Sequence, residues 1–131
     1  MNAFEYANPA TVEEAVGLLS ANWGETEVLA GGTDLISLLK AGLTQPKLVV
    51  SLVNVKGLSG IESKGGAVRI GAMTKLKDFV ANKDVQSNFP GLVQAAKNIS
   101  SHQMLNMGTV GGEVLQRPRC WYFRNGLGLL G

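Results

Sequence analysis

Two glycine pairs carry the residue types best suited to holding a ligand. Residues 30–34 read Ala-Gly-Gly-Thr-Asp, and residues 109–113 read Thr-Val-Gly-Gly-Glu. A glycine pair lets the backbone enter conformations closed to other residues and brings bare N–H groups close to a partner. Successive N–H groups form a concave site for anions, and the flanking threonine hydroxyls are further donors. Two such loops favour a nucleotide or dinucleotide cofactor whose two phosphates they hold.

Each glycine motif taken alone has a simpler explanation. Gly31 and Gly32 fit a plain strand-to-helix turn about as well as a phosphate loop, and Asp34 fits a carboxylate that the helix dipole stabilises. A third pair, Gly65 and Gly66, is best explained as a hairpin turn, because the flanking residues alternate in polarity. Only the repetition of the pattern favours a cofactor.

The remaining reactive side chains are sparse. Cys120 is the single cysteine, so no disulfide forms within the chain, which suits a reducing compartment. His102 is the single histidine and is more plausibly a surface residue than a ligand contact. One histidine and one cysteine do not make an ordinary metal site, and no nucleophile–base pair is present. We therefore predict no catalytic and no metal-ligating residue.

Composition narrows the class of protein. Of 131 residues, 45% are hydrophobic and 17% charged, which is enough to build a folded core. A net charge of +2 is too small to indicate nucleic acid or a membrane surface as partner. The first residues lack the basic and apolar regions of a signal peptide, and no apolar run approaches membrane-spanning length. We expect a cytoplasmic protein.

The elements around the first glycine pair alternate between strand and helix. Thr11 and Glu14 have the spacing of a capping box at the start of an apolar helical repeat, and Gly42 is placed to end a later helix. Strands are predicted at residues 4–6, 27–30 and 47–52, and helices after residue 11 and at residues 34–40.

The second half has a different pattern. A β-hairpin is predicted over residues 60–71, because polar and apolar residues alternate on either side of a glycine turn. Further predictions are a helix capped by Thr74, a helix over 90–99 and a strand at 113–115. The last residues are apolar and carry no helix-ending signal, so we expect an interrupted domain.

Three motifs together resemble a known family. Residues 30–35, 70–74 and 106–112 occur in the order and approximate spacing of the FAD-binding (medium) subunit of molybdenum hydroxylases. This group includes xanthine dehydrogenase, carbon monoxide dehydrogenase and aldehyde oxidoreductase. Residues 115–124 are similar to the branch typified by bacterial aldehyde oxidoreductase FAD subunits. The resemblance covers essentially the whole chain.

The resemblance implies an α+β fold and a bound FAD. The fold would be a two-subdomain FAD-binding domain of the PCMH type, similar to vanillyl-alcohol oxidase. Residues 1–55 would form its N-terminal α/β subdomain, and residues 56–131 the start of a second, truncated α+β subdomain. In the family both glycine loops wrap the FAD pyrophosphate. The cofactor-binding residues so implied are Leu29, Ala30, Gly31, Gly32, Thr33, Asp34, Leu35, Gly108, Thr109, Gly111 and Gly112.

The function implied is electron transfer. A large subunit with the molybdenum cofactor would oxidise an aldehyde, purine or similar substrate, and FAD would receive electrons from [2Fe–2S] clusters on a small subunit. The chain alone is expected to be inactive. One alternative is a truncated remnant that binds no FAD and acts as an interaction module. Another is an unrelated nucleotide-binding module, against which the predicted hairpin and residues 73–74 argue.

Some residues depart from the family pattern or have an open role. Glu113 stands where the family usually has Asn or Ser, which places a carboxylate near the expected phosphates. Leu105 replaces a common Arg. Some relatives carry an iron–sulfur cluster near the position of Cys120, but a cubane needs four thiolates, so a free or interface cysteine fits better. The aromatic run 121–123 indicates core or interface.

Overall fold

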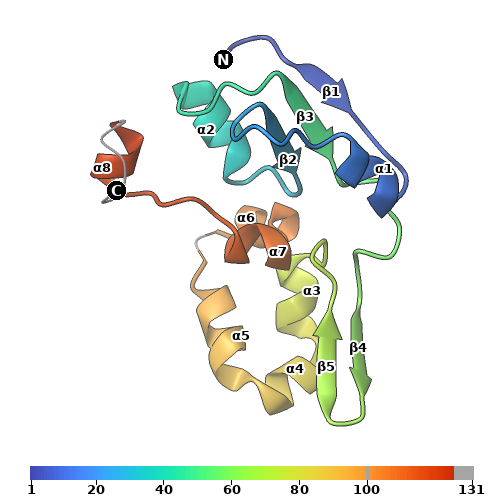
Figure 1. The fold of residues 1–131 in the computed structure, drawn as a ribbon. Coiled ribbons are helices and arrows are strands. Elements are labelled where there is room, and N and C mark those ends of the chain that lie inside the picture. Colours follow the sequence, from blue (N-terminus) through green and yellow to red (C-terminus); the bar gives the residue numbers. More distant parts are fainter. Residues whose placement is uncertain (100, 126–131) are drawn as a thin grey trace.

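A computed structural model describes residues 1–99 and 101–125 and shows two groups of elements packed end to end (Figure 1). The first group contains a parallel three-stranded sheet in the order β1-β3-β2. Its elements are β1 (Glu5–Ala7), α1 (Val12–Gly17), β2 (Thr26–Leu29), α2 (Leu35–Ala41) and β3 (Leu48–Ser51). Both helices are the crossovers that parallel strands require.

Local signals explain this first group. The predicted capping box forms: Thr11 Oγ1 accepts from the Glu14 N–H at 3.1 Å, and the Glu14 carboxylate accepts from the Thr11 N–H at 3.3 Å. Gly42 ends α2 with a φ of 70°, a conformation that glycine adopts without steric cost. Val49 and Val50 of the central strand are only 1% and 0% exposed, as expected for an apolar strand covered on both faces. The predicted strands and helices of residues 1–52 are confirmed.

The second group is an antiparallel hairpin covered by short helices. The elements are β4 (Ile61–Lys64), β5 (Ala67–Ile70), α3 (Leu76–Ala81), α4 (Lys83–Asn88), α5 (Pro90–Lys97), α6 (His102–Met107), α7 (Val110–Val114) and α8 (Trp121–Arg124). Gly65 and Gly66 turn the hairpin with φ values of 60° and 80°, which confirms the predicted turn. Phe79, Val85 and Val93 form the buried core between the helices and the hairpin.

Two predicted features of this second group are wrong. Thr74 does not cap α3, because the N-cap of this helix is Lys75. The Thr74 hydroxyl instead donates to the Gly60 carbonyl and accepts from the Gly60 N–H, both at 3.0 Å. Residues 113–115 are not a strand, because α7 runs through Val114. A three-residue apolar run has no periodicity that separates strand from helix. The sequence reading also missed α4 and α6, which begin at side-chain caps from Asn82 and Ser101.

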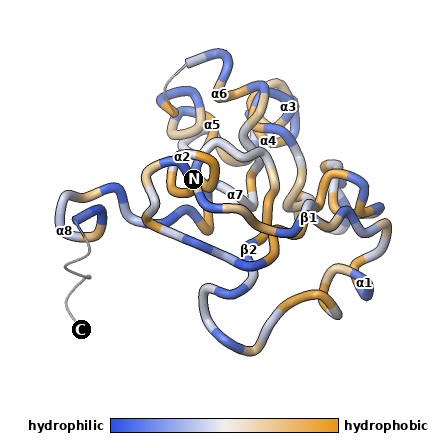
Figure 2. Tube along the Cα trace, turned by 90° about the horizontal axis from the view of Figure 1, so that it is seen from above, coloured by the Kyte–Doolittle hydropathy of each residue, from blue (hydrophilic) through white to orange (hydrophobic). Residues whose placement is uncertain are grey.

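The helix α8 stands apart from the other elements in both views (Figures 1 and 2). Trp121 and Tyr122 on this helix are 80% and 68% exposed. The aromatic run is therefore not core in the described structure, and its assignment to an interface stays a prediction. Within residues 1–99 and 101–125, no helix is long and apolar enough to cross a membrane.

Candidate cofactor site at the two glycine loops

The first glycine loop, residues 30–34, connects the end of β2 to the start of α2. Gly32 has a φ of 76°, a left-handed conformation that a residue with a Cβ rarely adopts. The Ile36 N–H donates to the Gly32 carbonyl at 3.2 Å, which is the first main-chain hydrogen bond at the start of α2. Among the described residues, none accepts a hydrogen bond from the N–H groups of residues 31–35. The loop therefore offers five consecutive main-chain donors to an anion.

In the second glycine loop, residues 108–112, the main-chain N–H groups of residues 110–112 donate to acceptors within the protein. The Gly111 N–H donates to the Ala72 carbonyl at 2.8 Å, and the Val110 N–H donates to the Thr74 carbonyl at 2.9 Å. The Gly112 N–H donates to Thr109 Oγ1 at 3.1 Å, which starts α7. These donors are bound within the protein, so the loop is a packed helix start and not an open turn after a strand.

Close packing explains why position 111 is glycine. A Cβ there would lie 2.8 Å from the Ala72 Cβ and 3.0 Å from the Ala72 carbonyl oxygen. Thr109 is only 1% exposed, and the neighbouring Met73 and Thr74 are also buried. The second glycine loop therefore docks on residues 72–74, which belong to another of the motifs behind the family resemblance.

The fold brings the two glycine loops together. A Cβ at Gly31 would overlap the carbonyl oxygen of Met107 and would lie 3.2 Å from the Gly108 Cα. Lys75 Nζ donates to the same Met107 carbonyl at 3.0 Å. Two segments more than seventy positions apart in the sequence thus meet backbone to backbone. Only glycine at position 31 allows this approach.

Two arginines that sequence reasoning missed lie beside the first glycine loop. Arg117 Nη2 is 2.6 Å from Glu27 Oε1, and the Arg117 main-chain N–H donates to Asp34 Oδ2 at 3.2 Å. Arg119 Nη2 is 3.2 Å from Asp34 Oδ1, although that buried oxygen makes no aligned hydrogen bond among the described residues. These arginines and their carboxylate partners are 83 to 90 positions apart in the sequence, so no local sequence pattern predicted the pairs.

The other predicted residues of the site lie at or near the loops. Leu29, Ala30, Thr33 and Leu35 are half-buried around the first glycine loop. Glu113 is half-buried in the first turn of α7, where its Oε2 accepts from Gln116 Nε2 at 3.1 Å.

The single histidine and the single cysteine lie outside the two glycine loops. His102 is exposed at the first position of α6, as predicted, and Cys120 is a half-buried free thiol whose sulfur accepts from the Phe123 N–H at 3.5 Å. No group of three or more potential metal ligands occurs in residues 1–99 and 101–125.

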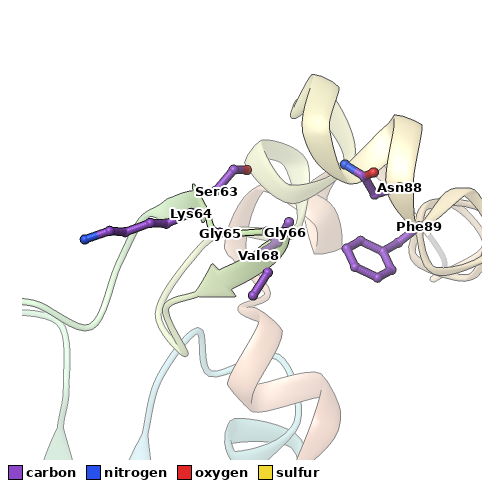
Figure 3. A pocket seen from close by; sticks show the side chains of 8 residues that line it. Ser63, Lys64, Gly65, Gly66, Val68, Asn88 and Phe89 are labelled. Atoms are coloured by element: carbon purple, nitrogen blue, oxygen red, sulfur yellow. The ribbon is translucent and has the colours of Figure 1, made fainter.

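One surface hollow of the described part lies away from the two glycine loops. It measures about 390 Å³ and lies between the β4–β5 turn and the residues that join α4 to α5. Figure 3 shows Asn88 and Phe89 facing the glycine turn, while the Lys64 side chain points away from the hollow. A hollow without an inward-facing charge does not suit a pyrophosphate.

Comparison with known proteins decides the family. The model of the FAD binding domain in molybdopterin dehydrogenase matches residues 2–119. The chain belongs to this family. FAD is thereby its cofactor, and the resemblance drawn from the three motifs is confirmed.

Several members of the family are close in sequence. The carbon monoxide dehydrogenase medium chain of Hydrogenophaga pseudoflava is 39% identical over 85% of this chain and 39% of its own length. The aldehyde oxidoreductase FAD-binding subunit PaoB of Escherichia coli is 36% identical over 94% of this chain and 38% of its own length. The chain therefore spans less than two fifths of these relatives.

A solved structure shows the same fold. The carbon monoxide dehydrogenase from Hydrogenophaga pseudoflava that lacks the Mo-pyranopterin moiety superposes with a TM-score of 0.81 and 38% identity, over 86% of this chain and 39% of that chain. The mixed arrangement of helices and strands agrees with the predicted α+β class. Relatives of this kind are subunits of oxidoreductases.

Proposed function

We propose that this chain is the N-terminal part of the FAD-binding electron-transfer subunit of a molybdenum-dependent hydroxylase or dehydrogenase. In this proposal residues 1–55 are the first subdomain of a two-subdomain domain of the vanillyl-alcohol-oxidase type. Residues 56–131 begin the second subdomain. Family membership and the 38–39% share of the relatives' length support this reading.

The observation that carries the proposal is the row of free donors in the first glycine loop. The N–H groups of residues 31–35 meet no acceptor among the described residues, and the loop sits against the second glycine loop at Gly31. A pyrophosphate is a doubly charged acceptor of the kind that such donors bind. The residues present therefore fit the cofactor that the family implies.

The two glycine loops have different roles in this proposal. The first binds the phosphate oxygens through its main-chain N–H groups, whereas the second forms the facing wall. The proposed cofactor-binding residues are Leu29, Ala30, Gly31, Gly32, Thr33, Asp34, Leu35, Gly108, Thr109, Gly111 and Gly112. When bound, the flavin supplies the redox chemistry, relaying electrons from [2Fe–2S] clusters to an acceptor.

The proposed partners are the other subunits of the same enzyme. Relatives are named medium chains or medium subunits, as in the nicotine 6-hydroxylase medium subunit of Paenarthrobacter nicotinovorans, 36% identical over 86% of this chain and 39% of its own length. We propose a large subunit with the molybdenum cofactor and a small [2Fe–2S] subunit. Oxidation of an aldehyde, purine or similar substrate belongs to the large subunit.

The test is direct titration of the purified chain with FAD. We expect flavin absorption bands in the purified protein, or quenching of flavin fluorescence when FAD is added. The titration is repeated on the chain co-produced with its partner subunits. A protein that is colourless and causes no quenching in both forms would refute the proposal and favour a remnant that binds no FAD.

A further inference from the structure

Two carboxylates flank the first glycine loop on either side. Glu27 lies in β2 before the loop, and Asp34 lies at its end as the N-cap of α2. Their side chains are only 12% and 17% exposed. Asp34 makes no capping hydrogen bond to its own helix. Glu27 lies four positions before Gly31, and Asp34 lies at the end of the row of donors, so uncompensated negative charge on either would weaken the attraction of the loop for an anion.

Arg117 contacts both carboxylates. Its guanidinium is 2.6 Å from Glu27 Oε1, where Thr44 Oγ1 also donates at 3.0 Å, and its main-chain N–H donates to Asp34 Oδ2. The guanidinium carbon lies 5.1 Å from the centre of the Trp23 ring, close enough for a cation–π contact. Arg119 stands beside Asp34 but is half exposed.

The segment that carries Arg117 also links the two glycine loops. It follows α7 directly, and α7 begins in the second glycine loop. A side chain that only filled space would not need to reach both flanks of the first loop. Arg117 instead binds the strand before that loop with its guanidinium and the helix after it with its main chain.

We propose that Arg117 is a positioning residue for the cofactor: it fixes both flanks of the first glycine loop and compensates the charge of Glu27. The charge of Glu27 then no longer opposes an anion bound at the free N–H groups. This inference rests on the proposed binding of FAD, and it adds a residue outside both glycine motifs to that site.

The geometry allows the charge to be tested separately from the backbone. Arg117→Gln removes the ion pair with Glu27 but keeps the main-chain bond to Asp34. Uncompensated Glu27 should then weaken FAD binding roughly ten-fold at low salt, and less at high salt because the repulsion is screened. The double variant Arg117→Gln/Glu27→Gln removes both charges and should return the FAD Kd to within about two-fold of wild type.

The experiment measures the FAD Kd by fluorescence titration, with the melting temperature recorded for each variant, in whichever form of the protein binds FAD. Lys64→Gln at the turn end of the β4–β5 hairpin is the matched control, since it removes one exposed positive charge at the end of the hairpin opposite to residues 70–74 and should leave the Kd unchanged. The inference is overturned if Arg117→Gln has the FAD Kd of wild type. It is also overturned if the folded double variant binds FAD as weakly as Arg117→Gln does. Neither outcome would contradict FAD binding by the wild-type protein.

A second variant decides the matter if Arg117→Gln does not fold. Arg117→Lys keeps the positive charge beside Glu27, so an FAD Kd close to that of wild type supports charge compensation. A ten-fold loss with Arg117→Lys in a folded protein overturns it. Failure of the wild-type protein to bind FAD at all overturns the proposed function together with this inference.

Discussion

The two glycine loops share a sequence pattern but use their main-chain donors in opposite ways. In the first, the N–H groups of residues 31–35 meet no acceptor among the described residues; in the second, Gly111 and Gly112 donate to Ala72 and Thr109. The first follows a strand of the sheet, whereas the second starts a helix that docks on residues 72–74. A glycine pair therefore indicates that the backbone comes close to another group. Whether that group belongs to the protein or to a ligand depends on which segments the fold packs against the loop.

The largest expected effect is on the second glycine loop, where a substitution should act on the fold. Gly111→Val would drive a branched side chain into Ala72, whose Cβ lies 2.8 Å from a Cβ at position 111. We expect the free energy of unfolding to fall by about 1–3 kcal/mol, measured by urea denaturation. Gly91→Val is the control, because a Cβ there meets nothing within 4 Å. Equal stability of the two variants would show that the second glycine loop is not tightly packed.

The first glycine loop should respond in ligand affinity more than in stability. At Gly32 the atoms nearest to a Cβ would belong to the flexible side chains of Ile36 and Leu29, at 2.8 and 3.4 Å. The cost of Gly32→Val in the folded protein is then mainly the left-handed backbone, about 1–2 kcal/mol. Because that conformation orients the free donors, we expect the FAD Kd to rise more than ten-fold, as measured by fluorescence titration.

Gly42→Val separates strain from binding. Gly42 has a similar φ of 70° and open surroundings, but it lies at the far end of α2. It should cost similar stability and leave the FAD Kd unchanged. If both variants weaken FAD binding equally, the first glycine loop has no special role in holding the cofactor.

The local parts of this comparison were predictable from sequence, and the tertiary parts were not. The Thr11–Glu14 capping box and the Gly65–Gly66 turn depend on neighbouring residues, so their patterns indicated the correct structure. The pairing of Arg117 with Glu27 joins residues 90 positions apart, and no periodicity records it. Whether Gly111 donates to a ligand or to Ala72 depends equally on packing between distant segments.

A smaller effect is expected at the helix that follows the second glycine loop. Glu113 places a half-buried carboxylate in the first turn of α7, two residues from Gly111. If this loop forms the wall facing the phosphates, Glu113→Asn should lower the FAD Kd by a few-fold at low salt. The gain should shrink as salt is added. Asp78→Asn, an exposed acid on α3, is the control; the same Kd for wild type and Glu113→Asn would place Glu113 away from the phosphates.

The smallest effect concerns an ion pair that precedes β2 and β3, at the opposite ends of these strands from the first glycine loop. Lys47 Nζ donates to Glu25 Oε1 at 2.7 Å, and the Ser20 and Asn22 side chains donate to Oε2. The Lys47 hydrogen bond, followed by those from Ser20 and Asn22, lowers the pKa of Glu25 from 4.5 to about 2.

A lowered carboxylate pKa means that the ionised pair stabilises the folded state above pH 4.5, and that this contribution disappears as the pH falls from 4.5 toward 2. Lys47→Met should therefore flatten the decline of the melting temperature across that interval, though only slightly, because exposed pairs contribute little. The FAD Kd at neutral pH should not change, since the pair is remote from the donors of the first glycine loop. A higher FAD Kd for Lys47→Met would mean that the first glycine loop responds to any disturbance of the sheet. Changes in FAD affinity would then not distinguish the first glycine loop, with its free donors, from the packed second loop.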